Sequence, residues 1–191
     1  MDALLISTVV IFVAELGDKS QLMAMTFAAR YRARDVLVGI TLATAVVHLA
    51  SVGIGAAIGG AFADYQDAIN VAAGIAFLAF AAWTLRGDEL TDDEAARAGG
   101  TQGAAILAVG VAFFLAELGD KTMLATITLA TDEGWLGTWI GSTVGMMAAD
   151  ALAIWVGALL GRQLPEKAIR YGATAAFVVF GVLLIGQGLL G

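Results

Sequence analysis

The sequence predicts an all-α membrane protein with six transmembrane helices, arranged as two inverted three-helix repeats. Of its 191 residues, 60% are hydrophobic and only 14% are charged, against about 25% charged in soluble domains. Six apolar segments are long enough to cross a bilayer, which takes about 20 residues. In addition, Ala-Glu-Leu-Gly-Asp-Lys occurs twice, from residue 14 and from residue 116, an offset of 102 positions.

The six segments are joined by short connections, with one exception. We expect helices at residues 4–29, 36–62, 68–86, 104–130, 135–161 and 168–189. Several of these are longer than a bilayer needs, which favours tilt or a local break. The exception is the acidic stretch 87–103, which we interpret as a solvated linker. It divides the chain into a first repeat at 1–86 and a second, inverted repeat at 104–191.

The basic residues predict the orientation in the membrane. Two of the ten, Lys19 and Lys121, lie inside spans, and the rest fall at the ends of the first, third and fifth spans. These eight are Arg30, Arg32, Arg34, Arg86, Arg97, Arg162, Lys167 and Arg170. Because cytoplasmic loops are enriched in Lys and Arg, we expect these loops and the linker in the cytoplasm and both termini outside it. We therefore expect a multi-pass protein of the cell (inner) membrane.

The repeat extends beyond the motif. At the same offset Ser20 aligns with Thr122, Gly39 with Gly141, and Gly55 with Gly157. Three spans per repeat is an odd number, so the second repeat enters the membrane from the opposite side. Inverted repeats of this kind typically place a transport site at the repeat interface, near the bilayer midplane.

The motif places charged residues inside the membrane, where they are energetically unfavourable. Glu15, Asp18 and Lys19 fall near the middle of the first span, and Glu117, Asp120 and Lys121 near the middle of the fourth. At about 2.5–3.5 kcal/mol per charge on insertion scales, these six residues must pair, line water or bind an ion.

The spacing of the acids favours a divalent-cation site. Glu15 and Asp18 share a helix face at i, i+3 spacing, and Glu117 and Asp120 repeat this from the opposing span. A glycine in each motif, Gly17 or Gly119, has no side chain, so either the backbones can approach closely or the helix can open locally and expose carbonyl oxygens. Further neutral oxygens come from Ser20, Thr122 and Gln21. Such oxygen-rich surroundings suit Ca²⁺, Mg²⁺ or Mn²⁺.

Two interpretations of the lysines remain open. Glu15–Lys19 and Glu117–Lys121 are i, i+4 pairs that would form salt bridges on a continuous helix. Alternatively, the lysines act as gates or moving counter-charges. Salt bridges alone leave Asp18 unexplained, and they give no reason for the duplication.

A second pair of polar residues lies at the same offset within apolar sequence. Asp150 and His48 fall near the middle of the fifth and second spans. Ionisable residues inside a membrane are functional candidates by default, and histidine titrates near neutral pH. We regard both as candidate proton-relay residues, with hydrogen-bonded packing as the alternative for His48.

The doubled motif resembles the signature of a known transporter family. Glu15-Leu16-Gly17-Asp18-Lys19-Ser20 and Glu117-Leu118-Gly119-Asp120-Lys121-Thr122 both match Glu-x-Gly-Asp-Lys-Ser/Thr. This motif is found twice in the six-span cation transporters known as uncharacterised protein family 0016, which includes transmembrane protein 165 and bacterial manganese exporters. The resemblance covers essentially the whole chain. It implies transport of Mn²⁺ or Ca²⁺ in exchange for protons, and among small bacterial members it suggests Mn²⁺ export.

Composition excludes several other functions. The chain has no cysteine, one histidine and a net charge of -7, which argues against thiolate or multi-histidine metal sites and against nucleic-acid partners. We expect no enzymatic activity, no resident cofactor, and the lipid bilayer, divalent cations and protons as partners. The main alternative is an exporter of small organic cations or amino acids, which would need a roomier, aromatic-lined cavity. The sequence does not specify the oligomeric state.

Overall fold

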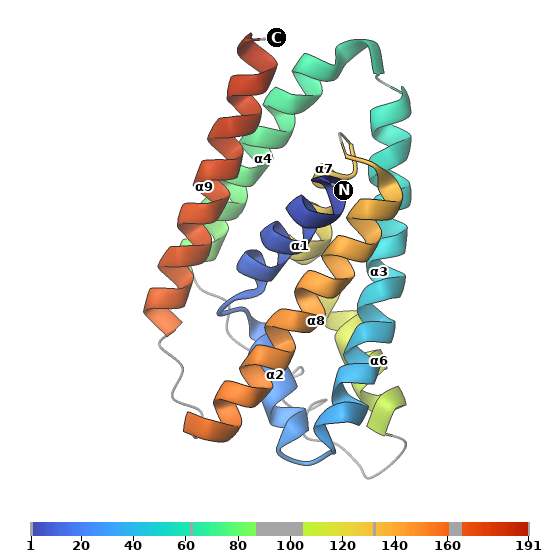
Figure 1. Cartoon of the computed structure of the whole chain (residues 1–191), viewed down its shortest axis with the longest axis vertical. Helices are drawn as coiled ribbons and strands as arrows, with labels where there is room; N and C mark the ends of the chain where they lie inside the picture. The colour runs from blue at the N-terminus through green and yellow to red at the C-terminus, as the bar shows by residue number, and fades with distance from the viewer. Residues whose placement is uncertain (1, 62, 87–104, 132, 161–165, 191) are drawn as a thin grey trace.

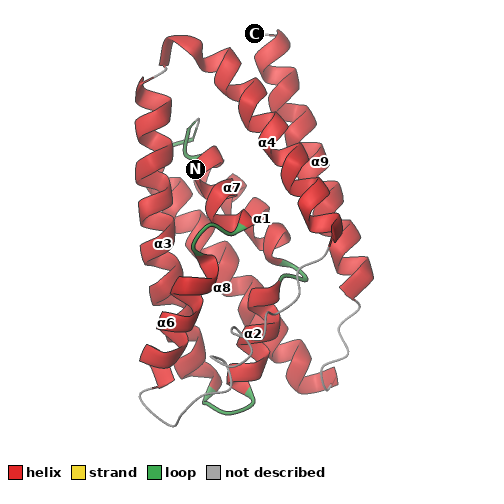
Figure 2. Ribbon diagram, turned by 180° about the vertical axis from the view of Figure 1, so that it is seen from behind, coloured by secondary structure: helices red, strands yellow, loops and turns green. Residues whose placement is uncertain are grey.

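The computed structural model describes residues 2–61, 63–86, 105–131, 133–160 and 166–190, and these residues form α-helices without a strand. The helices are α1 (Asp2–Glu15), α2 (Lys19–Ala28), α3 (Ala33–Ala61), α4 (Gln66–Arg86), α6 (Ala105–Glu117), α7 (Lys121–Leu129), α8 (Trp135–Leu160) and α9 (Glu166–Leu190), with a 3₁₀ turn at Ala63–Tyr65. The all-α prediction is confirmed for this part of the chain (Figures 1 and 2). The predicted linker at 87–103 lies outside the described residues.

The first and fourth predicted segments are each interrupted. Residues 4–29 contain α1 and α2, and residues 104–130 contain α6 and α7, so of the two expectations for the long segments, tilt or a local break, these two have a break. The other four segments each contain one helix. Two of the described helices, at Ala33–Ala61 and Trp135–Leu159, are by themselves long and apolar enough to cross a membrane, while the remaining apolar helices are shorter.

Helices related by the 102-residue offset run in opposite directions. In Figure 1, α3 rises from the lower end of the bundle while α8 descends, and the α1–α2 pair descends while the α6–α7 pair rises. The two halves also pack alike, since α8 lies against α1 as α3 lies against α6. Gly141 approaches the backbone of α1 near Leu4, and Gly39 approaches α6 at the equivalent Ile106.

Two long helices form the centre of the bundle. α3 and α8 pack against each other, and Trp139 Nε1 donates a hydrogen bond of 2.8 Å to the carbonyl oxygen of Ala45. Thr44 Oγ1 lies 3.1 Å from the sulfur of Met146, its own equivalent in the second repeat. This contact joins two residues that the 102-residue offset relates, one from each half of the chain.

The surface carries many large apolar side chains. They are exposed along α3, α6 and α9, among them Leu42, Leu107 and Leu183. Meanwhile Glu15, Asp18 and other charged side chains are fully buried. Extended apolar surface around buried charges is informative, and a lipid environment explains it.

The core consists of two apolar clusters. One joins α2, α6 and the start of α3 through Phe27, Ile40 and Phe113. The other joins α1, α7, α4 and α9 through Ile11, Leu129 and further side chains. Each interrupted segment runs from one cluster into the other, so the two helix breaks lie between the clusters, with apolar packing on both sides.

Candidate cation site at the two helix breaks

Each motif forms the break between two half-helices. α1 ends at Glu15 and α2 begins at Lys19, and in the second repeat α6 ends at Glu117 and α7 begins at Lys121. Between them a glycine adopts a left-handed conformation, with φ 77° at Gly17. Only glycine adopts this conformation without steric cost, which is why the motif contains it. The predicted local opening of the helix is confirmed.

The second motif glycine allows a direct test of the break. Gly119 has φ 79°, and nothing lies within 4 Å of a Cβ atom placed there. We expect Gly119→Ala to lower the free energy of unfolding by about 1–2 kcal/mol through backbone strain alone, and to reduce cation transport. Gly53→Ala is the matched control because it also meets nothing within 4 Å but lies inside α3. Thermal unfolding in detergent that leaves Gly119→Ala as stable as the control would contradict this account.

The four acidic side chains of the motifs are buried. Glu15, Asp18 and Glu117 have no exposed surface, and Asp120 is 5% exposed. The carboxyl ends of α1 and α6 terminate beside them, and helix C-termini carry partial negative charge that favours cations. Buried charges of one sign need partners of the other.

Those partners come from the opposite repeat. Lys121 Nζ lies 2.6 Å from Asp18 Oδ1, and Lys19 Nζ lies 3.6 Å from Asp120 Oδ1. The lysines therefore tie the two breaks together. The i, i+4 geometry that would pair each lysine with the glutamate of its own motif on one helix face is wrong, because the helix is interrupted between the two residues.

The two ion pairs are not equivalent. The side chain of Lys121 is 2% exposed, whereas that of Lys19 is 20% exposed and lies 1 Å farther from its aspartate. Since burial strengthens electrostatic interactions, the Lys121–Asp18 pair is the stronger. Sequence reasoning could not distinguish two identical motifs.

Hydroxyl groups hold the glutamates. Ser20 donates a hydrogen bond to Glu15 Oε1, and Thr122 donates one of 2.9 Å to Glu117 Oε2. The other oxygens, Glu15 Oε2 and Glu117 Oε1, have no hydrogen-bond partner within the described residues. Each glutamate thus keeps one oxygen for an ion or a proton.

A side chain one turn into each second half-helix caps the glycine. The backbone N–H of Gly17 donates to Gln21 Oε1 at 2.8 Å, and that of Gly119 contacts Met123 Sδ at 3.2 Å. Gln21 also donates to the carbonyl oxygen of Ala149 at 3.0 Å, which fastens the first break to α8. Sequence reasoning placed Gln21 near the site but missed the capping role of Met123, whose only signal was its alignment with Gln21.

Asp150 lies close to the motifs. It is fully buried on α8, next to Ala149, and within electrostatic range of Glu15 and Glu117. Neither of its carboxyl oxygens has a hydrogen-bond partner in the described part of the chain. His48 on α3 is also fully buried, and both its ring nitrogens lack such a partner there.

The site is not a preformed ligand cage. Within the described ranges, no three Asp, Glu or His side chains gather as they would around a metal ion. The aspartates instead face the ammonium groups of the lysines. Coordination of one ion by Glu15, Asp18, Glu117 and Asp120 therefore remains a prediction that requires the lysines to withdraw.

Comparison with known proteins identifies the family. The model of the family described as "Divalent cation/proton antiporter GDT1" matches residues 3–92 and 105–190, which leaves out only residues 1–2, 93–104 and 191. The chain belongs to the GDT1 family. Both motifs lie within the matched residues. No solved structure matches the chain.

Relatives within the GDT1 family cover most of the chain. A Vibrio cholerae protein named "Putative manganese exporter" is 33% identical over 187 residues, covering 95% of this chain and 90% of that protein. GDT1-like protein sll0615 of Synechocystis is 30% identical, covering 91% of each chain. The chloroplast protein PAM71 of Arabidopsis thaliana is 31% identical over 93% of this chain, which spans 55% of that longer protein.

Proposed function

We propose that this protein is a membrane antiporter that exports Mn²⁺, and also carries Ca²⁺, in exchange for protons. The single observation that carries the proposal is that the lysine of each buried helix break forms an ion pair with the aspartate of the other break. Family membership supports antiport, and the name of the Vibrio relative supports Mn²⁺.

The proposed topology has six spans, with α1–α2 and α6–α7 as two broken ones. Equivalent helices run antiparallel, as inverted repeats require, and the exposed apolar faces support a bilayer around them (Figure 1). The basic residues favour a cytoplasmic position for the ends of α2 and α4, where Arg30 and Arg86 lie. Both termini then lie outside the cytoplasm.

The charges of the site suit one divalent ion. The four motif carboxylates exceed the two lysines by two negative charges. In this structure the ammonium group of each lysine lies beside an aspartate, where we propose that the cation binds. When the cation binds, it displaces the lysines, and Glu15 and Glu117 supply their unpartnered oxygens. Hard oxygen ligands of this kind match Mn²⁺ and Ca²⁺.

Proton coupling follows if carboxylates exchange the cation for protons. Two protons taken up by two carboxylates balance the charge of one departing divalent ion. Asp150 is placed to take part because it lies beside the motif glutamates without a hydrogen-bond partner in the described residues. His48 remains the weaker candidate for a proton relay, since its supporting observation is burial alone.

Flux measurements in proteoliposomes test the proposal. We expect Mn²⁺ uptake to follow an opposing proton gradient, to drive protons the other way, and to fall when the loading side is acidified, because protons and cation compete for the same oxygens. Ca²⁺ should compete with Mn²⁺. Flux that ignores both pH and a protonophore would rule out antiport, and an organic cation carried in place of Mn²⁺ would favour the alternative substrate class.

A further inference from the structure

The inverted repeats are packed differently at the two ends of the bundle. At one end α3 meets α7, and at the other α8 meets α2, its equivalent by the 102-residue offset. In a perfectly symmetric molecule these two contacts would be the same. The two contacts differ, and in only one of them do the backbones of the two helices touch.

The α3–α7 end is closed by direct contact of backbones. A Cβ atom added to Gly55 would collide with the carbonyl oxygen of Ile127 and would lie 2.7 Å from Ala130 Cβ. At Gly59 the added atom would collide with the carbonyl oxygen of Thr131. Gly55 and Ala130 are both buried. The two helices therefore touch without a side chain between them.

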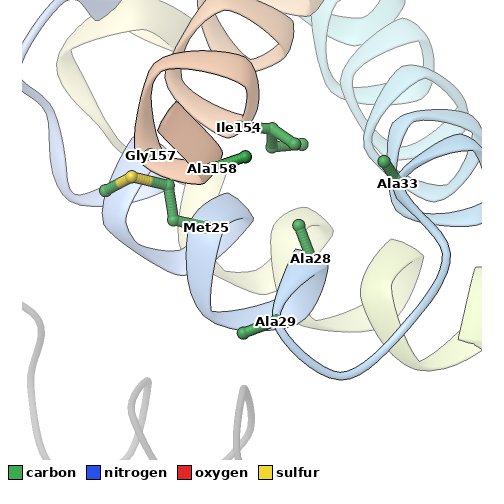
Figure 3. A pocket seen from close by; sticks show the side chains of 7 residues that line it. All are labelled: Met25, Ala28, Ala29, Ala33, Ile154, Gly157 and Ala158. Carbon is green, nitrogen blue, oxygen red and sulfur yellow. The ribbon is translucent and has the colours of Figure 1, made fainter. Parts of the chain in front are cut away.

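The α8–α2 end is held apart by a side chain. The three atoms nearest to a Cβ atom added to Gly157 all belong to the side chain of Met25, with Sδ at 2.5 Å and Cγ at 3.1 Å. Beside this contact is a cavity of about 280 Å³ lined by residues of α2, α8 and Ala33. Figure 3 shows Met25 and Ala28 facing Gly157 and Ala158 across it. Ala28, the equivalent of Ala130, is only partly buried.

The outer helix pair follows the same asymmetry. α9 packs against α1, and α4 packs against α7. The symmetry-related pairs, α4 with α6 and α9 with α2, are not among the substantial contacts between described helices. The α4–α9 pair therefore packs on the half-helices of the closed end and not on their equivalents, α2 and α6.

From this broken symmetry we infer that Gly55 and Gly157 are alternating contact points for the second half-helices. In the conformation described here α7 is seated on Gly55 and α2 is off Gly157. In the second conformation α2 seats on Gly157, which closes the cavity, while α7 moves off Gly55. The inference rests on the proposed function, because a transporter must expose the same site first to one side of the membrane and then to the other.

Single alanine substitutions should separate the two conformations. Gly157→Ala is tolerated here, because Met25 is flexible and can turn aside, but it blocks the seating of α2 on the backbone. Gly55→Ala blocks the contact that is formed here. We therefore expect Gly157→Ala to hold the protein in the present conformation and Gly55→Ala to favour the other, while Gly53→Ala, which meets nothing within 4 Å, shifts neither.

Maleimide labelling reports the shift, because the chain contains no native cysteine. Single cysteines at Ala28 and Ala130 probe equivalent positions at the two ends. In the unmodified background we expect position 28 to label at least tenfold faster than position 130. Gly157→Ala should widen this ratio and arrest Mn²⁺ flux, and Gly55→Ala should narrow or reverse it. If Gly55→Ala does not fold, as judged by size-exclusion chromatography, the Gly157→Ala variant decides alone.

The labelling experiment tests the change of helix contacts, and the flux experiment tests the proposed cargo. A folded Gly157→Ala protein that labels and transports like the Gly53→Ala control would overturn the inference, as would equal labelling of positions 28 and 130. If the labelling ratios shift as expected but the unmodified protein carries no Mn²⁺, the exchange of helix contacts stands and the proposed cargo is wrong.

Discussion

Replacing Asp18 with asparagine is expected to abolish Mn²⁺ transport and to weaken the fold. Asp18 is fully buried, and its Oδ1 lies 2.6 Å from the ammonium group of Lys121, which is itself 2% exposed. Neutralising one partner of a buried ion pair leaves the other without compensation, at about 3–5 kcal/mol. From sequence alone we expect Mn²⁺ binding to be lost with the fold intact, since removing a buried carboxylate lowers the cost of membrane insertion. The ion pair with Lys121 leads us to expect a loss of stability as well.

A second substitution separates binding from folding. In Asp18→Asn/Lys121→Met the buried charges are removed together, so stability should largely return while Mn²⁺ binding stays lost. Asp120→Asn is the matched variant in the other repeat. Its partner Lys19 is 20% exposed at 3.6 Å, so the loss of stability should be smaller, whereas the loss of binding should be similar.

Thermal unfolding in detergent and Mn²⁺ binding by calorimetry provide the readouts. We expect the order of stability to be wild type, then Asp120→Asn, then Asp18→Asn, with both variants failing to bind. If both aspartate variants bind and carry Mn²⁺ normally, the motif is a packing device and the proposed site is wrong.

Removing the buried lysine is expected to raise Mn²⁺ affinity and slow turnover. Lys121 competes with the cation for Asp18, so Lys121→Met leaves the site with more negative charge and no tethered competitor. We expect affinity to rise about tenfold or more, equivalent to about 1.4 kcal/mol, and flux to fall because release becomes slower. Lys19→Met should change affinity less, since that lysine is farther from its aspartate and partly exposed to solvent.

The comparison between the two lysines is the informative measurement. Binding isotherms and flux are measured together for Lys121→Met and Lys19→Met. They distinguish a lysine that competes with the cation from one that only holds the two helix breaks together. Lower Mn²⁺ affinity in Lys121→Met, with the fold intact, would show that the ammonium group organises the ligands instead of competing for them.

The sequence alone determined much of the architecture. Low charge and six apolar segments predicted helices at the described positions, because backbone groups in lipid must be satisfied within the segment. The duplicated motif predicted two equivalent sets of buried charges, and its glycine predicted a local opening. These features are local, so composition and spacing specify them.

Other features were decided only by the tertiary structure. Each lysine forms an ion pair with an aspartate of the other repeat, whereas sequence spacing left a partner in the same motif as one of two open interpretations. Two identical motifs also acquired unequal ion pairs, and Gly55 and Gly157 acquired unequal contacts. A sequence repeat specifies equivalent local structure in both halves, but contacts between helices depend on packing across the whole bundle. Here the backbone of α7 contacts Gly55, whereas the side chain of Met25 separates α2 from Gly157.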